Sequence, residues 1–256
     1  MSNSVEVLNT SADTSATPSY AIWGGMYDND RHEYVEFFDD FHGKVAEGGV
    51  YNYDESDDNA AFTISTTAPN GELGLVIASD DNEELTMNTV APLCKIDGNT
   101  GKVFFEARIK TSAITDDNAL FCGLGLIISA GNAIYQDDDT AALATAVSFV
   151  GFRSLCADGD GLDAVYKTAS GSEGVVLELA HTLVADTYVK VGLTFDGKVG
   201  GTITYFVNGV AVGTVTEDTS GFPDNVNLAF VMGNKVGANA ALTTTIDWVK
   251  VAHERI

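Results

Sequence analysis

The feature that most constrains the fold of this chain is a period-two alternation of apolar and polar residues. It is clearest in residues 102–112, KVFFEARIKTS. One face of this segment carries Val103, Phe105, Ala107 and Ile109, and the other carries Glu106, Arg108 and Lys110. Successive side chains of a strand point to opposite faces of a sheet, so the segment predicts a strand with one buried face. Residues 187–196 repeat the alternation, and residues 242–252 are rich in β-branched side chains, so both predict further strands.

Turn residues separate these segments. The dipeptide Asn208-Gly209 lies between two apolar runs and accepts the positive φ angles of a type I′ turn, which predicts a hairpin. Other expected turns are Asn70-Gly71, Asp97-Gly98 and Asp196-Gly197. The remaining expected strands are 72–78, 120–129, 146–153, 175–180, 202–207 and 227–232. Only residues 139–146 have a helix-like composition, so the pattern predicts an all-β sandwich with a single domain over residues 34–256.

The first 33 residues differ from the rest and are predicted to form an extended N-terminal arm. Residues 1–19 are rich in Ser, Thr, Ala and Asn, with neither the basic start nor the apolar stretch of a signal peptide. The arm then gathers large apolar side chains at Tyr20, Ile22, Trp23, Met26 and Tyr27. We expect these residues to pack on this domain or on a neighbouring protein, and we treat them as candidate partner-binding residues.

Charge and cysteine usage restrict the partners. The chain has 13 basic and 37 acidic residues, a formal net charge of −24. Such a surface repels nucleic-acid phosphates and anionic lipid, so neither nucleic acid nor a membrane is expected as a partner. The three cysteines, Cys94, Cys122 and Cys156, are odd in number and well separated, which predicts buried free thiols rather than disulfides or a zinc site.

Several polar and aromatic residues could form a site, but most of them have a simpler structural interpretation. Asp158, Asp160 and Asp163 alternate with glycines and could bind calcium, but no Glu completes an EF-hand loop, so a solvated turn is favoured. Glu106 stands alone on its strand beside Arg108 and suggests a surface ion pair. No paired carboxylates, metal-binding histidines or nucleotide motifs were found, so no catalytic site and no cofactor are expected. Trp23 and Trp248 could stack on sugars, although packing is favoured for Trp248.

Several segments, taken in order, resemble the concanavalin A-like jelly roll of tailed-phage virion proteins. They begin with Phe37-Phe38-Asp39-Asp40-Phe41 and continue through 103–110, 120–126, 150–152, 188–193, 205–209 and 246–251. The resemblance covers nearly all of residues 34–256. It implies two stacked antiparallel sheets, and it brings no catalytic residues with it because this sandwich hosts many functions.

The resemblance implies a structural virion protein, with capsid decoration as the first hypothesis. Such a protein would be made in the host cytoplasm, would bind the major capsid protein on the outer capsid surface, and would act as a homo-oligomer. The second hypothesis is a carbohydrate-binding module of a phage fibre or adhesin, with a surface glycan as its partner. The third is a polysaccharide-degrading enzyme, which the missing carboxylate pair disfavours.

Overall fold

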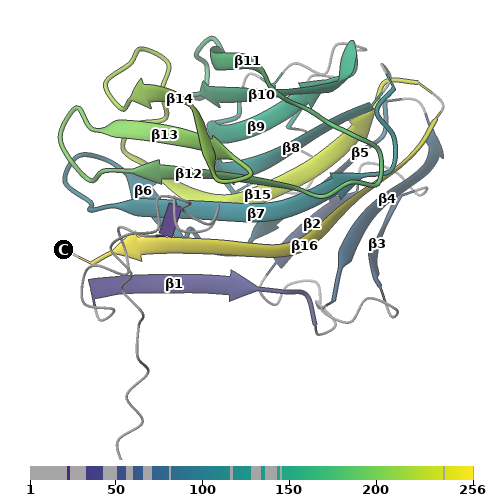
Figure 1. Cartoon of the computed structure of the whole chain (residues 1–256), viewed down its shortest axis with the longest axis horizontal. Coiled ribbons are helices and arrows are strands. Elements are labelled where there is room, and N and C mark those ends of the chain that lie inside the picture. The colour runs from purple at the N-terminus through teal and green to yellow at the C-terminus, as the bar shows by residue number, and fades with distance from the viewer. Residues whose placement is uncertain are drawn as a thin grey trace, which may run out of the picture.

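The computed structural model describes eleven stretches of the chain. They are residues 22–23, 33–42, 51–55, 60–65, 71–80, 82–115, 118–127, 134–135, 143–144, 146–238 and 240–255. Within them, sixteen strands form two eight-stranded sheets in which every pairing is antiparallel (Figure 1). No helix in this part of the chain has the length and apolar character needed to cross a membrane.

Sheet A contains both the first and the last strand. Its strands run in the order β14-β13-β12-β7-β16-β4-β3, and β1 pairs with the second half of β16. The bounds are β1 (Tyr34–Asp39), β3 (Ala60–Ile64), β4 (Leu73–Asp80), β7 (Val103–Thr111), β12 (Val189–Phe195), β13 (Thr202–Val207), β14 (Val210–Thr216) and β16 (Ala240–Glu254).

Sheet B lies behind sheet A in Figure 1. Its strands run in the order β11-β10-β9-β8-β15-β5-β2, and β6 pairs with the first residues of β15. The bounds are β2 (Tyr51–Glu55), β5 (Glu84–Thr89), β6 (Cys94–Ile96), β8 (Asn118–Gly125), β9 (Phe149–Leu155), β10 (Asp158–Lys167), β11 (Gly174–Thr182) and β15 (Val226–Val236).

The core lies between the sheets and confirms the predicted fold class. The four apolar residues of the predicted alternation, Val103, Phe105, Ala107 and Ile109, are all fully buried on the inner face of β7. Phe105 packs across the interface on Phe230 of β15, with ring centroids 6.1 Å apart. The three cysteines are buried and none of them forms a disulfide, as predicted. Burial raises the pKa of the Cys94 thiol to about 12, so this sulfur stays protonated.

The local turn predictions hold where the structure describes them. Asn208 and Gly209 have φ angles of 49° and 77° and join β13 to β14 in the predicted hairpin. The segment from Asp158 to Asp163 differs from its prediction. Although expected as a solvated turn, it begins strand β10, which pairs with both β9 and β11. Most of the helix-like stretch 139–146 lies outside the described residues.

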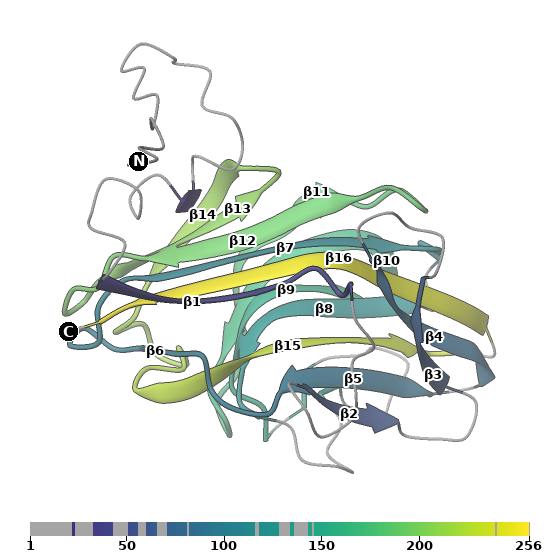
Figure 2. The same cartoon turned by 90° about the horizontal axis from the view of Figure 1, so that it is seen from below.

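The two outer faces are covered differently. On sheet B, Ile134, Tyr135 and Leu143 pack over Phe121 and its neighbours in a second apolar cluster. On sheet A, Ile22 and Trp23 form a small third cluster with residues of the strands beneath them. Figures 1 and 2 both place this short segment on the outside of sheet A. Beyond it, the outward side chains of sheet A surround an open pocket.

Candidate functional site

The candidate site is built from two rows of outward side chains on sheet A, where β1, β16, β7 and β12 are neighbours. Cross-strand pairing places Phe38 opposite Lys250, Lys250 opposite Glu106, and Glu106 opposite Gly192. The next row places Trp248 opposite Arg108, and Arg108 opposite Lys190. The polar positions of the predicted alternation in β7 therefore become the middle of a continuous surface.

The second row and the end of β1 line an open pocket of about 520 Å³. Its lining residues are Phe38, Asp40, Arg108, Lys190, Asp247 and Trp248. Phe38 is 59% exposed, and Trp248 is half-buried, so both can offer ring surface to a ligand. The pocket thus combines two aromatic rings with two cations and two carboxylates.

A β-bulge in β16 positions the anionic side of this pocket. Ile246 pairs with Ile109 and Trp248 pairs with Arg108, which leaves Asp247 as the extra residue between them. Bulges of this kind redirect side chains at functional surfaces. The carboxylate of Asp247 accepts a hydrogen bond from Nη1 of Arg108, so the two groups hold each other in place.

Tyr188 supports Arg108 from the other side. The guanidinium carbon of Arg108 lies 3.9 Å from the centroid of the Tyr188 ring, and Nζ of Lys110 lies 4.5 Å from it. The Tyr188 hydroxyl donates to the carboxylate of Glu72. Burial, followed by the nearby Glu72 carboxylate, raises the pKa of Tyr188 well above its usual range, so the phenol keeps its proton. These contacts restrict the guanidinium before any ligand arrives.

The predicted surface ion pair between Glu106 and Arg108 is wrong. Arg108 instead pairs with Asp247, which the bulge brings close. Glu106 is only 1% exposed, and its Oε2 accepts a hydrogen bond of 2.7 Å from Nε1 of Trp23. Its Oε1 lies 3.9 Å from Nζ of Lys190. Burial raises the pKa of Glu106, an effect opposed by the Trp23 hydrogen bond and by the charges of Lys190 and Lys250.

The structure packs Ile22 and Trp23 on the outer face of sheet A of their own domain. They are 2% and 4% exposed. The indole stacks on Phe104 with ring centroids 6.0 Å apart, and Nζ of Lys250 lies 4.2 Å from its centroid. Of the two alternatives for these residues, packing on this domain or on a neighbouring protein, the structure shows the first. Tyr20, Met26 and Tyr27, the other candidate partner-binding residues, lie outside the described part of the chain.

The calcium candidates Asp158, Asp160 and Asp163 do not converge. Oδ2 of Asp163 forms an ion pair with Nη1 of Arg153 at 2.9 Å. Oδ1 of Asp163 accepts a hydrogen bond from the backbone N–H of Leu179. Among the described residues, no three His, Cys, Asp or Glu side chains come close enough together to hold a metal ion. The geometry of this aspartate trio does not fit a calcium site.

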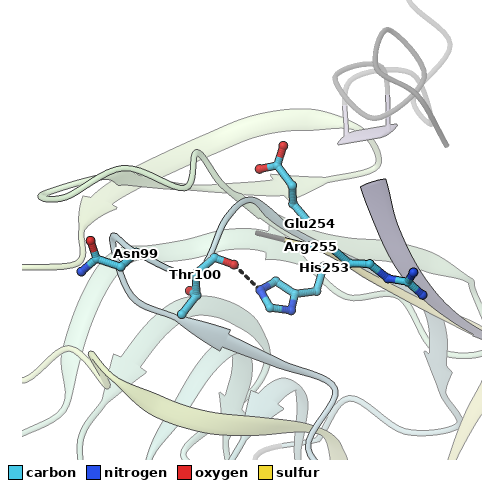
Figure 3. Close-up of a pocket in the computed structure, with 5 residues that line it drawn as sticks. All are labelled: Asn99, Thr100, His253, Glu254 and Arg255. Carbon is cyan, nitrogen blue, oxygen red and sulfur yellow. Dashed lines mark hydrogen bonds between the residues drawn. The ribbon is translucent and has the colours of Figure 1, made fainter. Parts of the chain in front are cut away.

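A second pocket of about 460 Å³ lies at the C-terminal end of β16 (Figure 3). The lining residues are Asn99, Thr100, His253, Glu254 and Arg255. Figure 3 shows the ring of His253 turned toward Thr100, where Nε2–H donates to the backbone carbonyl. Oε2 of Glu254 accepts the backbone N–H of Lys102 at 2.9 Å. These polar groups hold the 97–102 turn against β16, so a structural role accounts for them.

Comparisons with known proteins identify the fold alone. No family model and no curated protein matches the sequence. The carbohydrate recognition domain of Emp46p in its potassium-bound form matches with a TM-score of 0.56 and 8% identity, covering 81% of this chain and 92% of that one. The β-glucanase of Bacillus licheniformis matches with a TM-score of 0.53 and 15% identity, covering 86% and 98%. Peanut lectin matches with a TM-score of 0.53 and 14% identity, covering 88% and 99%. The chain therefore has the concanavalin A-like jelly-roll fold of lectins and glucanases.

Proposed function

We propose that this chain is a non-catalytic glycan-binding module, and that its ligand lies in the open pocket on the outer face of sheet A. The observation that carries the proposal is the placement of Phe38 and Trp248 beside Arg108, Asp247 and Asp40. A pyranose ring has an apolar C–H face, which can pack on aromatic rings, and hydroxyl groups at its edge, which can bond to charged side chains. Ligand sites commonly combine apolar surface with a few fixed polar groups in this way.

The structural neighbours support a glycan as the ligand class. The matching domain of Emp46p is a carbohydrate recognition domain, and the matching Bacillus protein is a β-glucanase. The same sandwich fold therefore serves sugar recognition in other proteins. The pairing of Arg108 with Asp247 also favours binding over catalysis. The carboxylate of Asp247 is held by its hydrogen bond from Arg108, which suits a fixed hydrogen-bond acceptor for a ligand.

A glycan array followed by calorimetric titration of the best ligand tests this proposal. We expect Trp248→Ala and Phe38→Ala each to weaken binding by at least about tenfold, because each removes ring surface from the pocket. Phe38 is exposed, so its substitution should leave folding intact. Val199→Ala, at a position 80% exposed and not among the pocket-lining residues, is the matched control. Absence of binding to every glycan, or equal binding by all variants, would refute the proposal.

Capsid decoration is the second candidate, and the edge of sheet B favours it. Strand β11 lies at this edge and exposes Val175, Leu177 and Leu179, with 43%, 38% and 56% of their surfaces accessible. Exposed apolar residues on an edge strand are typical of protein contacts. The net charge of −24 suits a position outside a shell that encloses DNA.

Co-sedimentation with tailed-phage capsids would test this second role. The double variant Val175→Lys/Leu177→Lys should lower capsid occupancy, because lysines at an edge oppose strand addition. Val184→Lys/Val199→Lys makes the matched change of two charges at exposed sites outside the strands. Failure of the wild-type protein to sediment with capsids would exclude decoration.

A further inference from the structure

We infer that the glycan-binding face extends past the open pocket into the place now filled by Ile22 and Trp23. These two residues then occupy a second sugar subsite and must leave it when a longer oligosaccharide binds. The inference rests on the glycan-binding function proposed above. It adds a second site and a means of regulating access to it.

The open pocket and the Trp23 site are adjacent parts of one surface. Lys190 lines the pocket, and its Nζ lies 3.9 Å from Oε1 of Glu106, whose other oxygen bonds to Trp23. Phe38 also lines the pocket and is paired in register with Lys250, whose ammonium group covers the indole. A chain of linked sugars lying across the strands could therefore pass from one part to the other.

The contacts made by the indole are those that a sugar ring could make. Phe104 provides an aromatic face, with the two rings inclined by 29°. Lys250 provides a cation above the ring, and Oε2 of Glu106 accepts one edge hydrogen bond. A pyranose presents the same combination of a broad apolar face and hydrogen-bond donors at its edge.

Glu106 has unused binding capacity in this site. Its Oε1 is buried and has no hydrogen-bond partner among the described residues. Nζ of Lys190 lies 3.9 Å away, beyond hydrogen-bond distance, and a buried acceptor that lacks a hydrogen bond is destabilising. Two neighbouring hydroxyls of a sugar could donate to both carboxylate oxygens, whereas the single N–H of an indole satisfies only one. The site is therefore incompletely matched to Trp23.

The surface beside Glu106 is flat enough to accept a ligand. Gly192 is opposite Glu106 on β12, and a Cβ atom at this position would come within 2.7 Å of Cδ1 of Ile22. The missing side chain lets Ile22 lie close to the sheet. The same space would let a sugar ring approach the backbone once Ile22 has left.

The inference is tested by comparing the binding affinities for a long and a short oligosaccharide. If Trp23 fills the second subsite most of the time, the apparent affinity for a ligand that needs both subsites is reduced by the fraction of molecules in which it is vacant. We expect Trp23→Ala to bind a β-glucan tetrasaccharide at least about fivefold more tightly than wild type. Binding of the disaccharide, which the open pocket can hold alone, should stay within about twofold. Trp23→Phe keeps a ring in the subsite and is the matched control.

Tryptophan fluorescence gives a second readout that does not depend on how well Trp23→Ala folds. The chain has two tryptophans, so subtracting the spectrum of Trp23→Phe from that of wild type isolates Trp23. Saturating tetrasaccharide should shift the emission of Trp23 to longer wavelength as the indole enters water, and the disaccharide should not.

The outcomes separate this inference from the proposed function. If wild type binds through Trp248 but Trp23→Ala gains no affinity and Trp23 emission does not move, only the second subsite is refuted. If neither wild type nor Trp23→Ala binds either oligosaccharide, both the proposed function and the inference fail for β-glucans. Binding by Trp23→Ala alone would support both.

Discussion

Arg153 illustrates how a charged residue is retained beneath the covered face of sheet B. Its side chain is only 7% exposed, and it pairs with Asp163 and Glu173. Nε of Arg153 also donates to Oε1 of Glu173 at 2.6 Å. Removing one partner of a buried ion pair leaves the other charge uncompensated in a poorly solvated place.

We expect Arg153→Met to lower the free energy of unfolding by about 3–5 kcal/mol, because Asp163 and Glu173 would lose their counter-ion. Lys198→Met removes an exposed pair with Asp196 and should cost at most about 1 kcal/mol. The Lys198 side chain is 77% exposed, which makes it a suitable comparison. Urea denaturation measures both values. Equal losses in the two variants would contradict the role given to Arg153.

Glu106 gives a pH-dependent prediction. Because burial raises its pKa in the folded protein, the folded state binds this proton more tightly than the unfolded chain does. Its contribution to stability is therefore greatest at low pH and is lost as the pH rises through the raised pKa. Gln cannot ionise, so Glu106→Gln should raise the unfolding temperature near pH ~7, and the gain should shrink toward pH ~4.

Thermal unfolding across this pH range measures the effect of Glu106→Gln, and the variant at low pH is its own control. A difference that does not change with pH would mean that contacts with Trp23, rather than the charge of Glu106, dominate. Loss of stability at every pH would have the same meaning.

At the scale of the element, a strand forms either because its own residue pattern favours extended backbone or because neighbouring strands pair with it. β7 and β13 lie where alternation and turn residues predict them. β10 does not, because its first residues read DGDGLD, a composition typical of turns. It becomes a strand by pairing with β9 on one side and β11 on the other. The pairing supplies what its own propensity lacks.

The β13–β14 hairpin allows a direct test at this scale. Gly209 has a φ of 77°, which strains residues with a branched Cβ. Gly209→Val should lower the free energy of unfolding by about 1–2 kcal/mol. Val210 is 66% exposed in the same hairpin, so Val210→Thr should have little effect. Chemical denaturation compares the two variants, and an equal, small effect would argue against a strained turn.

At the scale of the whole molecule, the net charge of −24 works against the compact state. Acidic residues outnumber basic ones by 37 to 13, so most long-range interactions on the surface are repulsive. Salt screens such repulsion, since the Debye length falls from about 30 Å at 0.01 M to about 8 Å at 0.15 M. The free energy of unfolding of this protein should therefore depend on the ionic strength of its medium.

Raising sodium chloride from about 0.01 M to 0.15 M should increase the unfolding temperature by several degrees, because screening relieves self-repulsion. Differential scanning calorimetry measures the shift. A decrease would mean that local ion pairs such as Arg108–Asp247 contribute more than the overall repulsion. In that case Asp247→Asn should remove much of the salt dependence.

The sequence by itself determined the fold class and the positions of individual strands and turns. Alternation in β7 follows from a backbone whose side chains point to opposite faces, and the Asn208-Gly209 turn follows from the φ angles that those residues accept. Only the tertiary structure decided which side chains meet. Arg108 and Asp247 are 139 residues apart, and Trp23 and Glu106 are 83 apart. Periodicity assigns a residue to a face, but its neighbours on that face depend on strand order and register, which packing of the whole core selects.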